Sequence, residues 1–273
     1  MPYAENDGAR IYWEEHGAGE PVLLIMGLGA TLDLWHRLLP SLSAGHRAIL
    51  LDNRGVGRSA VPDPPYSIPQ MADDAVAVLD AAAVDTAHVI GASMGGVIAQ
   101  ELALRRPDRV RSLVLACTAC GGPDAVAAPL EIRAALVGRA AMTPEEGIRA
   151  LVPFTYHPAT PRDRVEEDLR IRLRHYPSAK GYLAQLQAVL GYETYARLGA
   201  IRVSTLVLHG EDDQLVPAAN ARDIASRIRA ARLVLVPSAS HILFTDQPET
   251  VNRAILEFLH EAAAPTGVRS GRP

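Results

Sequence analysis

Short apolar runs typical of buried strands alternate with helix-like segments along most of this chain. Continuous runs such as Leu206-Val-Leu208 are typical of strands that are buried on both faces. Strands that alternate with helices favour a mostly parallel sheet covered by helices on both sides. We therefore predict an α/β fold with a mostly parallel eight-stranded sheet flanked by helices, whose first strand pairs antiparallel with the second. The expected strands are residues 2–4, 10–15, 22–25, 47–51, 87–90, 111–116, 205–208 and 232–236.

The alternation stops between residues 121 and 200. Only short helical stretches with arginine-rich polar faces and scattered tyrosines are expected there, and no buried strand. We interpret this segment as a helical cap, or lid, inserted after the sixth strand. Residues 1–120 and 201–273 are then predicted to form one core domain.

Three predicted helices begin with residues that cap helix ends. Ser67-Ile-Pro-Gln70 and Thr143-Pro-Glu-Glu146 match the capping box, in which two side chains satisfy the first unpaired N–H groups. Asp246-Gln-Pro-Glu249 is predicted to open the last helix, whose apolar residues recur on one face.

The composition is that of an ordinary globular protein. Of the 273 residues, 48% are hydrophobic and 21% are charged, and the net charge is -4. Nothing in the charge pattern suggests nucleic acid, and no run approaches the ~18 apolar residues of a membrane span. The first residues lack the basic and apolar regions of a signal peptide, so we expect a cytoplasmic protein.

The two cysteines, Cys117 and Cys120, have a C-x-x-C spacing. This spacing is compatible with a redox pair or with half of a zinc site. A structural zinc needs a second pair of ligands, however, and redox pairs of this kind usually open a helix in a different fold. We therefore expect two small residues at a strand end, and we predict neither a metal nor a cofactor.

A sharp strand-to-helix turn is predicted at Gly91-Ala-Ser-Met-Gly95. The G-x-S-x-G pattern is typical of a nucleophile elbow, which exposes a serine in a strained backbone conformation. Side chains at either flank would collide with the neighbouring strand and helix, so both flanking positions are glycine. The turn also directs the backbone N–H of Met94 at the reacting carbonyl. Ser93 is therefore the candidate nucleophile.

A candidate acid and a candidate histidine follow later in the chain. Asp213 lies just past the strand expected at 205–208, and His241 follows the strand expected at 232–236. Open parallel sheets place their sites at the carboxyl ends of strands, where Ser93 also lies. Nucleophile, acid and histidine occur in the chain order of the α/β-hydrolase triad, which differs from the order in two unrelated serine protease folds.

With these groups placed, the chain resembles the α/β-hydrolase fold family over nearly its full length. The residues that carry the resemblance are Gly27-Leu-Gly-Ala30, Asp52-Asn-Arg-Gly-Val-Gly-Arg-Ser59, Gly91-Ala-Ser-Met-Gly-Gly96, His209-Gly-Glu-Asp-Asp213 and His241. Within the family, the chain is most similar to bacterial serine carboxylesterases and 3-oxoadipate enol-lactonases. The resemblance implies a Ser-His-Asp triad, and it implies that the Asp-x-Arg-Gly-x-Gly-x-Ser segment is a structural turn.

The resemblance also implies which groups stabilise the oxyanion. The expected donors are the backbone N–H groups of Leu28 and Met94, each worth on the order of 3 kcal/mol. The family usually has His-Gly before this loop, whereas Met26-Gly27 stands here. A backbone donor survives that change, although a packing contact or hydrogen bond of the histidine is lost.

Several residues offer alternatives to these roles. Asp212 is the alternative acid, but the alignment with Gly210 and Pro217 favours Asp213. His209 also stands at a strand end, where the residue before the glycine normally packs structurally. In the cap, two histidines and five tyrosines are candidates for substrate contacts or for surface and core positions: His157, His175, Tyr156, Tyr176, Tyr182, Tyr192 and Tyr195.

The expected activity is hydrolysis of a small-molecule carboxylic ester or lactone through an acyl-enzyme. Haloalkane dehalogenases and epoxide hydrolases of this fold need a carboxylate where Ser93 stands, so both are excluded. Thioesterase, C–C hydrolase and cofactor-free perhydrolase activities are alternatives, as is a non-hydrolytic ligand-binding or scaffold role. Leu28, Met94 and the cap leucines favour a largely apolar acyl group. We expect no nucleic-acid or membrane partner, and a homo-oligomer is compatible with the sequence.

Overall fold

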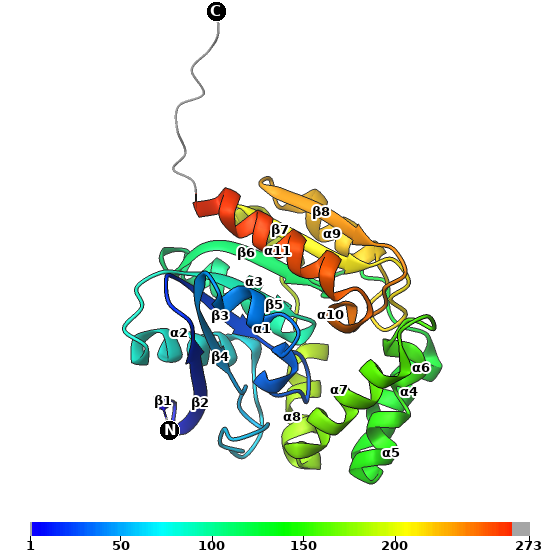
Figure 1. Cartoon of the computed structure of the whole chain (residues 1–273). Helices are drawn as coiled ribbons and strands as arrows, with labels where there is room; N and C mark the ends of the chain where they lie inside the picture. The colour runs from blue at the N-terminus through cyan, green and yellow to red at the C-terminus, as the bar shows by residue number, and fades with distance from the viewer. Residues whose placement is uncertain (1, 264–273) are drawn as a thin grey trace, which may run out of the picture.

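An eight-stranded sheet forms the centre of the molecule (Figure 1). The structure is a computed structural model that describes residues 2–263. The strand order is β1-β2-β4-β3-β5-β6-β7-β8, in which the β1–β2 and β2–β4 pairs are antiparallel and the others parallel. The predicted α/β fold with a mostly parallel sheet is confirmed. The strands are β1 (Tyr3–Asn6), β2 (Ala9–His16), β3 (Glu20–Ile25), β4 (His46–Leu51), β5 (Ala87–Ala92), β6 (Val110–Ala116), β7 (Thr205–Gly210) and β8 (Ala231–Val236).

The first two strands form a tight hairpin. Asp7 and Gly8 make the two-residue turn, and both have positive φ angles, of 49° and 71°. Such a turn matches the natural twist of paired strands and favours Asp-Gly. The turn sets the register in which Asn6 lies opposite Ala9.

Several strands are longer than their apolar runs predict. β5 continues through Gly91 and Ala92, and β7 continues through His209 and Gly210. Backbone pairing with the neighbouring strands extends these strands, whereas side-chain hydropathy marks only their apolar part. The extra residues carry each strand directly into the loops that hold the candidate site.

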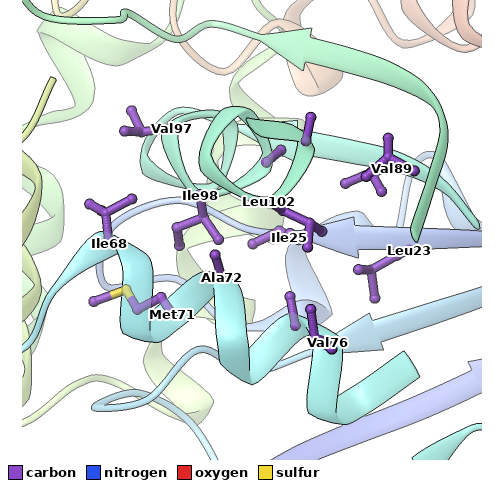
Figure 2. Close-up of a cluster of buried hydrophobic side chains, with 14 of the residues drawn as sticks. Leu23, Ile25, Ile68, Met71, Ala72, Val76, Val89, Val97, Ile98 and Leu102 are labelled. Atoms are coloured by element: carbon purple, nitrogen blue, oxygen red, sulfur yellow. The ribbon is translucent and has the colours of Figure 1, made fainter. Parts of the chain in front are cut away.

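Two apolar cores sandwich the sheet. In β3, Leu23 and Ile25 face one core and Val22 and Leu24 face the other, because successive strand side chains point to opposite faces. Figure 2 shows the first core, where Ile98 and neighbouring apolar side chains of two helices meet the strands. The helices of that face are α2 (Ile68–Ala81), α3 (Met94–Arg105) and α9 (Ala219–Arg227), and the 3-10 helix η2 (Pro107–Arg109) follows α3.

The second core lies on the opposite face of the sheet. The long helix α11 (Pro248–Ala263) buries four residues of its apolar stripe in it: Val251, Ile255, Phe258 and Leu259. The short elements α1 (Leu39–Ser43), η1 (Leu32–Trp35) and α10 (Leu243–Asp246) complete this layer. None of the helices within residues 2–263 has both the length and the apolar character needed to cross a bilayer.

Of the three predicted helix caps, one is complete, one is half-formed and one is wrong. Thr143 and Glu146 form the full capping box of α5 (Pro144–Arg149). Ser67 accepts a hydrogen bond from the N–H of Gln70, but the side-chain amide of Gln70 donates to the carboxylate of Asp7 in the β1–β2 turn instead of closing the box. Asp246 does not open α11, because it is the last residue of α10. Its carboxylate instead accepts hydrogen bonds from Ser240, His157 and Thr160.

Between β6 and β7, residues 117–204 form helices and loops and no strand. Helices in the middle of this inserted segment enclose a small apolar core, which contains Ile148, Tyr156, Val165 and Leu169. Figure 1 shows these helices, in green, grouped on one side of the sheet. The elements are α4 (Leu130–Gly138), η3 (Arg139–Ala141), α5 (Pro144–Arg149), α6 (Val152–Thr155), α7 (Arg162–Arg174), α8 (Ala179–Leu190) and η4 (Tyr195–Ala200). Residues 264–273 of the predicted core domain lie outside the described residues.

Candidate active site

Ser93 occupies the tight turn between β5 and α3. Its backbone angles are φ 55° and ψ -120°, a conformation that L-residues rarely adopt. A Cβ at Gly91 would collide with the backbone of Gly95, and a Cβ at Gly95 would collide with the backbone of Ile25. Both glycines are therefore needed to bring the serine this close to β3 and α3.

Two hydrogen-bonding contacts connect the three candidate residues, because His241 contacts Asp213 on one side and Ser93 on the other. Asp213 Oδ2 is 2.8 Å from His241 Nδ1, and His241 Nε2 is 3.1 Å from Ser93 Oγ. A carboxylate accepts hydrogen bonds, so His241 carries its proton on Nδ1, and Nε2 can accept the proton of the serine. The structure thus brings together the three side chains that the sequence places far apart.

Asp213 is held as an anion. Its Oδ1 accepts hydrogen bonds from the N–H groups of Leu215 and Val216, at 2.9 and 2.8 Å. Burial opposes ionisation, but the adjacent His241 and His209 outweigh it and lower the pKa of Asp213 to about 2. The carboxylate is therefore charged across the physiological pH range.

His209 supports Asp213 and has no contact with the serine. Its ring is fully buried, and Nε2 lies 2.7 Å from the carbonyl oxygen of Val216 and 3.2 Å from Asp213 Oδ2. A carbonyl can only accept, so Nε2 carries the proton and points toward the acid. This position agrees with the structural role expected for His209.

Asp212, the alternative acid, points elsewhere. Its side chain is 57% exposed, and its nearest basic partner is His157 Nε2 at 3.6 Å. The two adjacent aspartates therefore differ sharply, since only Asp213 faces His241.

Leu28 and Met94 are the residues whose backbone N–H groups are expected to stabilise an oxyanion. No hydrogen bond within residues 2–263 uses the N–H of Leu28 or of Met94, and both residues line the cavity that contains Ser93. A Cβ at Gly27 would lie 3.0 Å from Ser93 Cβ and 3.5 Å from Ser93 Oγ. The absence of that atom lets the Leu28 loop approach the serine.

A buried glutamine of α8 holds this loop in place. Gln185 Oε1 accepts a hydrogen bond from the N–H of Gly29 at 2.9 Å, and its Nε2 donates to the carbonyl oxygen of Arg54 at 2.7 Å. The inserted segment therefore fixes two core loops that precede Gln185 in the chain by more than 100 residues.

The Asp52–Ser59 segment forms a turn fixed by its own polar groups. Asp52 accepts from the N–H groups of Leu32 and Arg58, at 2.8 and 3.0 Å. Arg54 forms a bidentate pair with Asp74, and both side chains are almost completely buried. Asn53 donates to the carbonyl oxygen of Met26 at 2.8 Å, which supports the loop beside Leu28.

The loop that carries His241 is tied to the inserted segment. Asp246 accepts hydrogen bonds from the N–H of Ser240 at 2.7 Å, the N–H of His157 at 3.2 Å and the hydroxyl of Thr160 at 2.5 Å. Burial raises the pKa of this carboxyl group, while these three donors oppose the rise. The residues before and after the histidine are both anchored, because the N–H of Ile242 donates to the carbonyl oxygen of Thr155 at 2.9 Å.

A cavity of about 670 Å³ opens above Ser93. Its walls come from the core loops and from the inserted helices, and most of them are apolar. Apolar lining residues include Leu28, Leu34, Met94, Val97, Leu136, Leu151 and Leu186. Tyr156 and Tyr192 also line it, whereas Tyr182 is buried against the loop at Gly29.

The two cysteines are buried and are not bonded to each other. Cys117 lines the cavity near Ser93, and burial raises the pKa of its thiol well above its usual range. A protonated thiol is a poor nucleophile, so Cys117 does not compete with the serine.

Three residues of the site have contacts that sequence patterns do not indicate. These residues are Gln185, His209 and Asp246. Only His209 carries a signal, because it stands next to the glycine that ends β7. The others act over long sequence separations, and a capping pattern led to a different role for Asp246.

The fold and the site geometry agree with a known family. Residues 20–248 match the family model of the alpha/beta hydrolase fold. The chain therefore belongs to the α/β-hydrolase family, and its similarity to hydrolases supports hydrolytic activity.

Three similar proteins illustrate the range of the family. A protein from Azorhizobium caulinodans named "Putative carbamate hydrolase RutD" is 36% identical over 264 residues, covering 96% of this chain and 99% of the relative. The poly(3-hydroxyalkanoate) depolymerase of Ectopseudomonas oleovorans is 32% identical over 246 residues, covering 88% of this chain and 84% of the relative. The enol-lactonase from Burkholderia xenovorans LB400 superposes with a TM-score of 0.85 at 26% identity, covering 95% of this chain and 100% of that structure.

Proposed function

We propose that the protein hydrolyses a small carboxylic ester or lactone through an acyl-enzyme formed on Ser93. The observation that carries this proposal is the series Asp213–His241–Ser93 with contacts of 2.8 and 3.1 Å, beside two N–H groups that have no partner in the described part of the chain. That arrangement supplies a nucleophile, a base and an electrostatic site for the developing oxyanion.

In the first half of the cycle, Ser93 Oγ attacks the ester carbonyl and its proton moves to His241 Nε2. The N–H groups of Leu28 and Met94 stabilise the oxyanion of the tetrahedral intermediate. Asp213 holds the imidazole in position and stabilises its charged form. Collapse of the intermediate breaks the bond to the alkoxide leaving group, which takes the proton from His241.

In the second half, water attacks the acyl-enzyme. His241 removes a proton from the water, the same N–H groups stabilise the second oxyanion, and Ser93 leaves with the proton returned by His241. For a lactone, the alcohol and the acid remain in one product molecule. Every proton transfer in this scheme passes through one nitrogen, His241 Nε2.

The relatives support an acyl substrate and leave its class open. The enol-lactonase and the poly(3-hydroxyalkanoate) depolymerase both have names that indicate attack on an oxygen ester. The carbamate hydrolase name of the relative from Azorhizobium makes carbamate hydrolysis the second candidate. The same serine chemistry would give a carbamoyl-enzyme from a carbamate.

The decisive experiment compares the wild-type protein with Ser93→Ala. We expect a fluorophosphonate probe to label only the wild-type protein, and p-nitrophenyl esters and lactones to be hydrolysed only by it. Thioesters, carbamates and C–C substrates complete the panel. Persistent labelling of Ser93→Ala would show that the nucleophile is another residue, and turnover confined to carbamates would favour the second candidate.

A further inference from the structure

One buried arginine beside the candidate site has no carboxylate partner among the residues that the structure describes. Arg139 of η3 is 5% exposed and lines the cavity above Ser93. No salt bridge among residues 2–263 involves Arg139, whereas the similarly buried Arg54 and Arg109 each pair with an aspartate. A buried charge is costly unless an opposite charge compensates it. The uncompensated charge of Arg139 therefore indicates that a bound ligand, and not the polypeptide, supplies its negatively charged partner.

Two tyrosines orient the Arg139 guanidinium. Its carbon lies 4.5 Å from the ring centroid of Tyr182 and 5.2 Å from that of Tyr176, and Nε donates to the Tyr176 hydroxyl at 3.3 Å. Within the described part of the chain, no hydrogen bond uses the two terminal nitrogens, Nη1 and Nη2. The rings thus fix the plane of the guanidinium and leave its outer fork for a ligand.

The charges of the cavity wall favour an anion. The half-buried Arg172 also lines the cavity and forms no salt bridge within residues 2–263, and the exposed Arg133 stands at the cavity wall as well. Of the acidic lining residues, Asp168 already pairs with Arg37 and accepts from the Tyr156 hydroxyl, and Glu193 is exposed.

Arg139 also lies close to the reacting end of the cavity. The Tyr182 ring that stacks on the guanidinium packs against the loop after Leu28, because a Cβ at Gly29 would lie 2.9 Å from Tyr182 Cδ2. One aromatic ring therefore separates the cation from the loop that supplies the proposed oxyanion donor. A substrate with its carbonyl at Ser93 can place a second polar group at Arg139.

We propose that Arg139 binds a carboxylate carried by the substrate, so that the ester or lactone taken by this hydrolase is anionic at one end. A carboxylate fits because its two oxygens match the paired terminal N–H groups of a guanidinium. This inference deepens the proposed function and rests on it for the reacting bond, but the carboxylate site can be tested without turnover.

The first test measures binding of glutarate, a simple dicarboxylate, to Ser93→Ala protein by calorimetry. We expect glutarate to bind, the neutral glutaramide to bind at least about tenfold more weakly, and Arg139→Gln in the Ser93→Ala background to weaken glutarate binding about 10- to 100-fold. The matched control is Arg174→Gln, which removes an exposed arginine of the same segment that does not line the cavity. Equal binding of glutarate and glutaramide, or no binding of glutarate, would overturn the proposal.

The second test measures selectivity. The ratio of kcat/KM for mono-p-nitrophenyl glutarate to that for p-nitrophenyl butyrate should fall about 10- to 100-fold in Arg139→Gln, mainly through KM of the anionic ester. Arg139→Lys should retain part of the ratio, since it keeps the charge but loses the fork. An equal fall of kcat/KM for both esters would mean that Arg139 has only a packing role and does not bind the carboxylate.

The two proposals fail in different ways. If neither ester is hydrolysed in a Ser93-dependent reaction while glutarate still binds through Arg139, the proposed function is wrong and the carboxylate site stands. If Arg139→Gln does not fold, the comparison of glutarate with glutaramide on Ser93→Ala protein still decides the question.

Discussion

The contrast between two adjacent aspartates can be tested directly. Asp213→Asn should lower kcat about 10⁴-fold, because an amide cannot hold His241 in the required tautomer or stabilise its charged form. Asp212→Asn is the matched control, since its side chain is 57% exposed and faces His157. Steady-state kinetics with an ester that the wild-type protein hydrolyses would measure both variants. Unchanged turnover in Asp213→Asn would assign the acid to another residue.

The low pKa of Asp213 also affects stability. A carboxyl group with a folded-state pKa of about 2, below its ordinary value of 3.8, stabilises the fold above pH ~4 and loses this contribution as the pH falls. The difference in unfolding free energy between the wild-type protein and Asp213→Asn should therefore shrink by about 2 kcal/mol between pH 5 and pH 2.

Urea denaturation of both proteins at each pH measures this difference. Other carboxyl groups are common to both proteins, so their titration cancels. A difference that stays constant over this range would mean that the pKa of Asp213 is not lowered.

Among the structural elements, the turn at Ser93 depends on the absence of a Cβ atom at its flanking glycines. Gly95→Ala should destabilise the protein by about 1–3 kcal/mol, because the new Cβ would meet the backbone of Ile25 and Met26. It should also reduce turnover by displacing the loop that leads to Leu28.

Gly138→Ala provides the control for that change. Gly138 has a helical φ of -63°, and the nearest atom to its Cβ would be Met142 Cε at 3.9 Å. This substitution should leave stability unchanged or raise it by about 0.4–1 kcal/mol. Thermal unfolding of the two variants would separate steric crowding from the general loss of a glycine, and equal effects would contradict the crowding.

Local patterns were enough to predict most of the elements and the three residues of the series. Apolar runs mark the strands, and the loops that follow β5, β7 and β8 hold Ser93, Asp213 and His241. Local patterns also misplaced Asp246, because its sequence context matches a helix cap while its partners lie up to 89 residues away. A carboxylate near a helix start binds whichever donors the tertiary structure presents.

At the scale of the whole molecule, Asp246 links the core to the inserted segment. Asp246→Ala should lower the unfolding free energy by about 1–3 kcal/mol, since three donors lose their acceptor. It should also lower kcat, because Ser240 directly precedes His241. The control is Asp108→Ala, whose carboxylate is 63% exposed. Urea denaturation and ester kinetics would measure both, and an Asp246→Ala protein that matches this control would contradict the link.

The features that could not be predicted from the sequence are contacts between the inserted segment and the core. Arg139 and Gln185 lie in helices with no distinctive motif, and their importance appears only when the segment folds over the core. The predominantly apolar cavity agrees with the expected chemistry of the acyl pocket, but its arginines could not be placed on the cavity wall from spacing alone.

The double contact of Gln185 limits how the inserted segment of this protein can be exchanged. Exchanging residues 121–200 for the equivalent segment of a homologue is an attractive way to transplant substrate preference. A chimera that lacks an amide at position 185 would leave the N–H of Gly29 and the carbonyl of Arg54 unsatisfied. Donor segments should therefore be screened first for a glutamine at this position, before any pocket residue is compared.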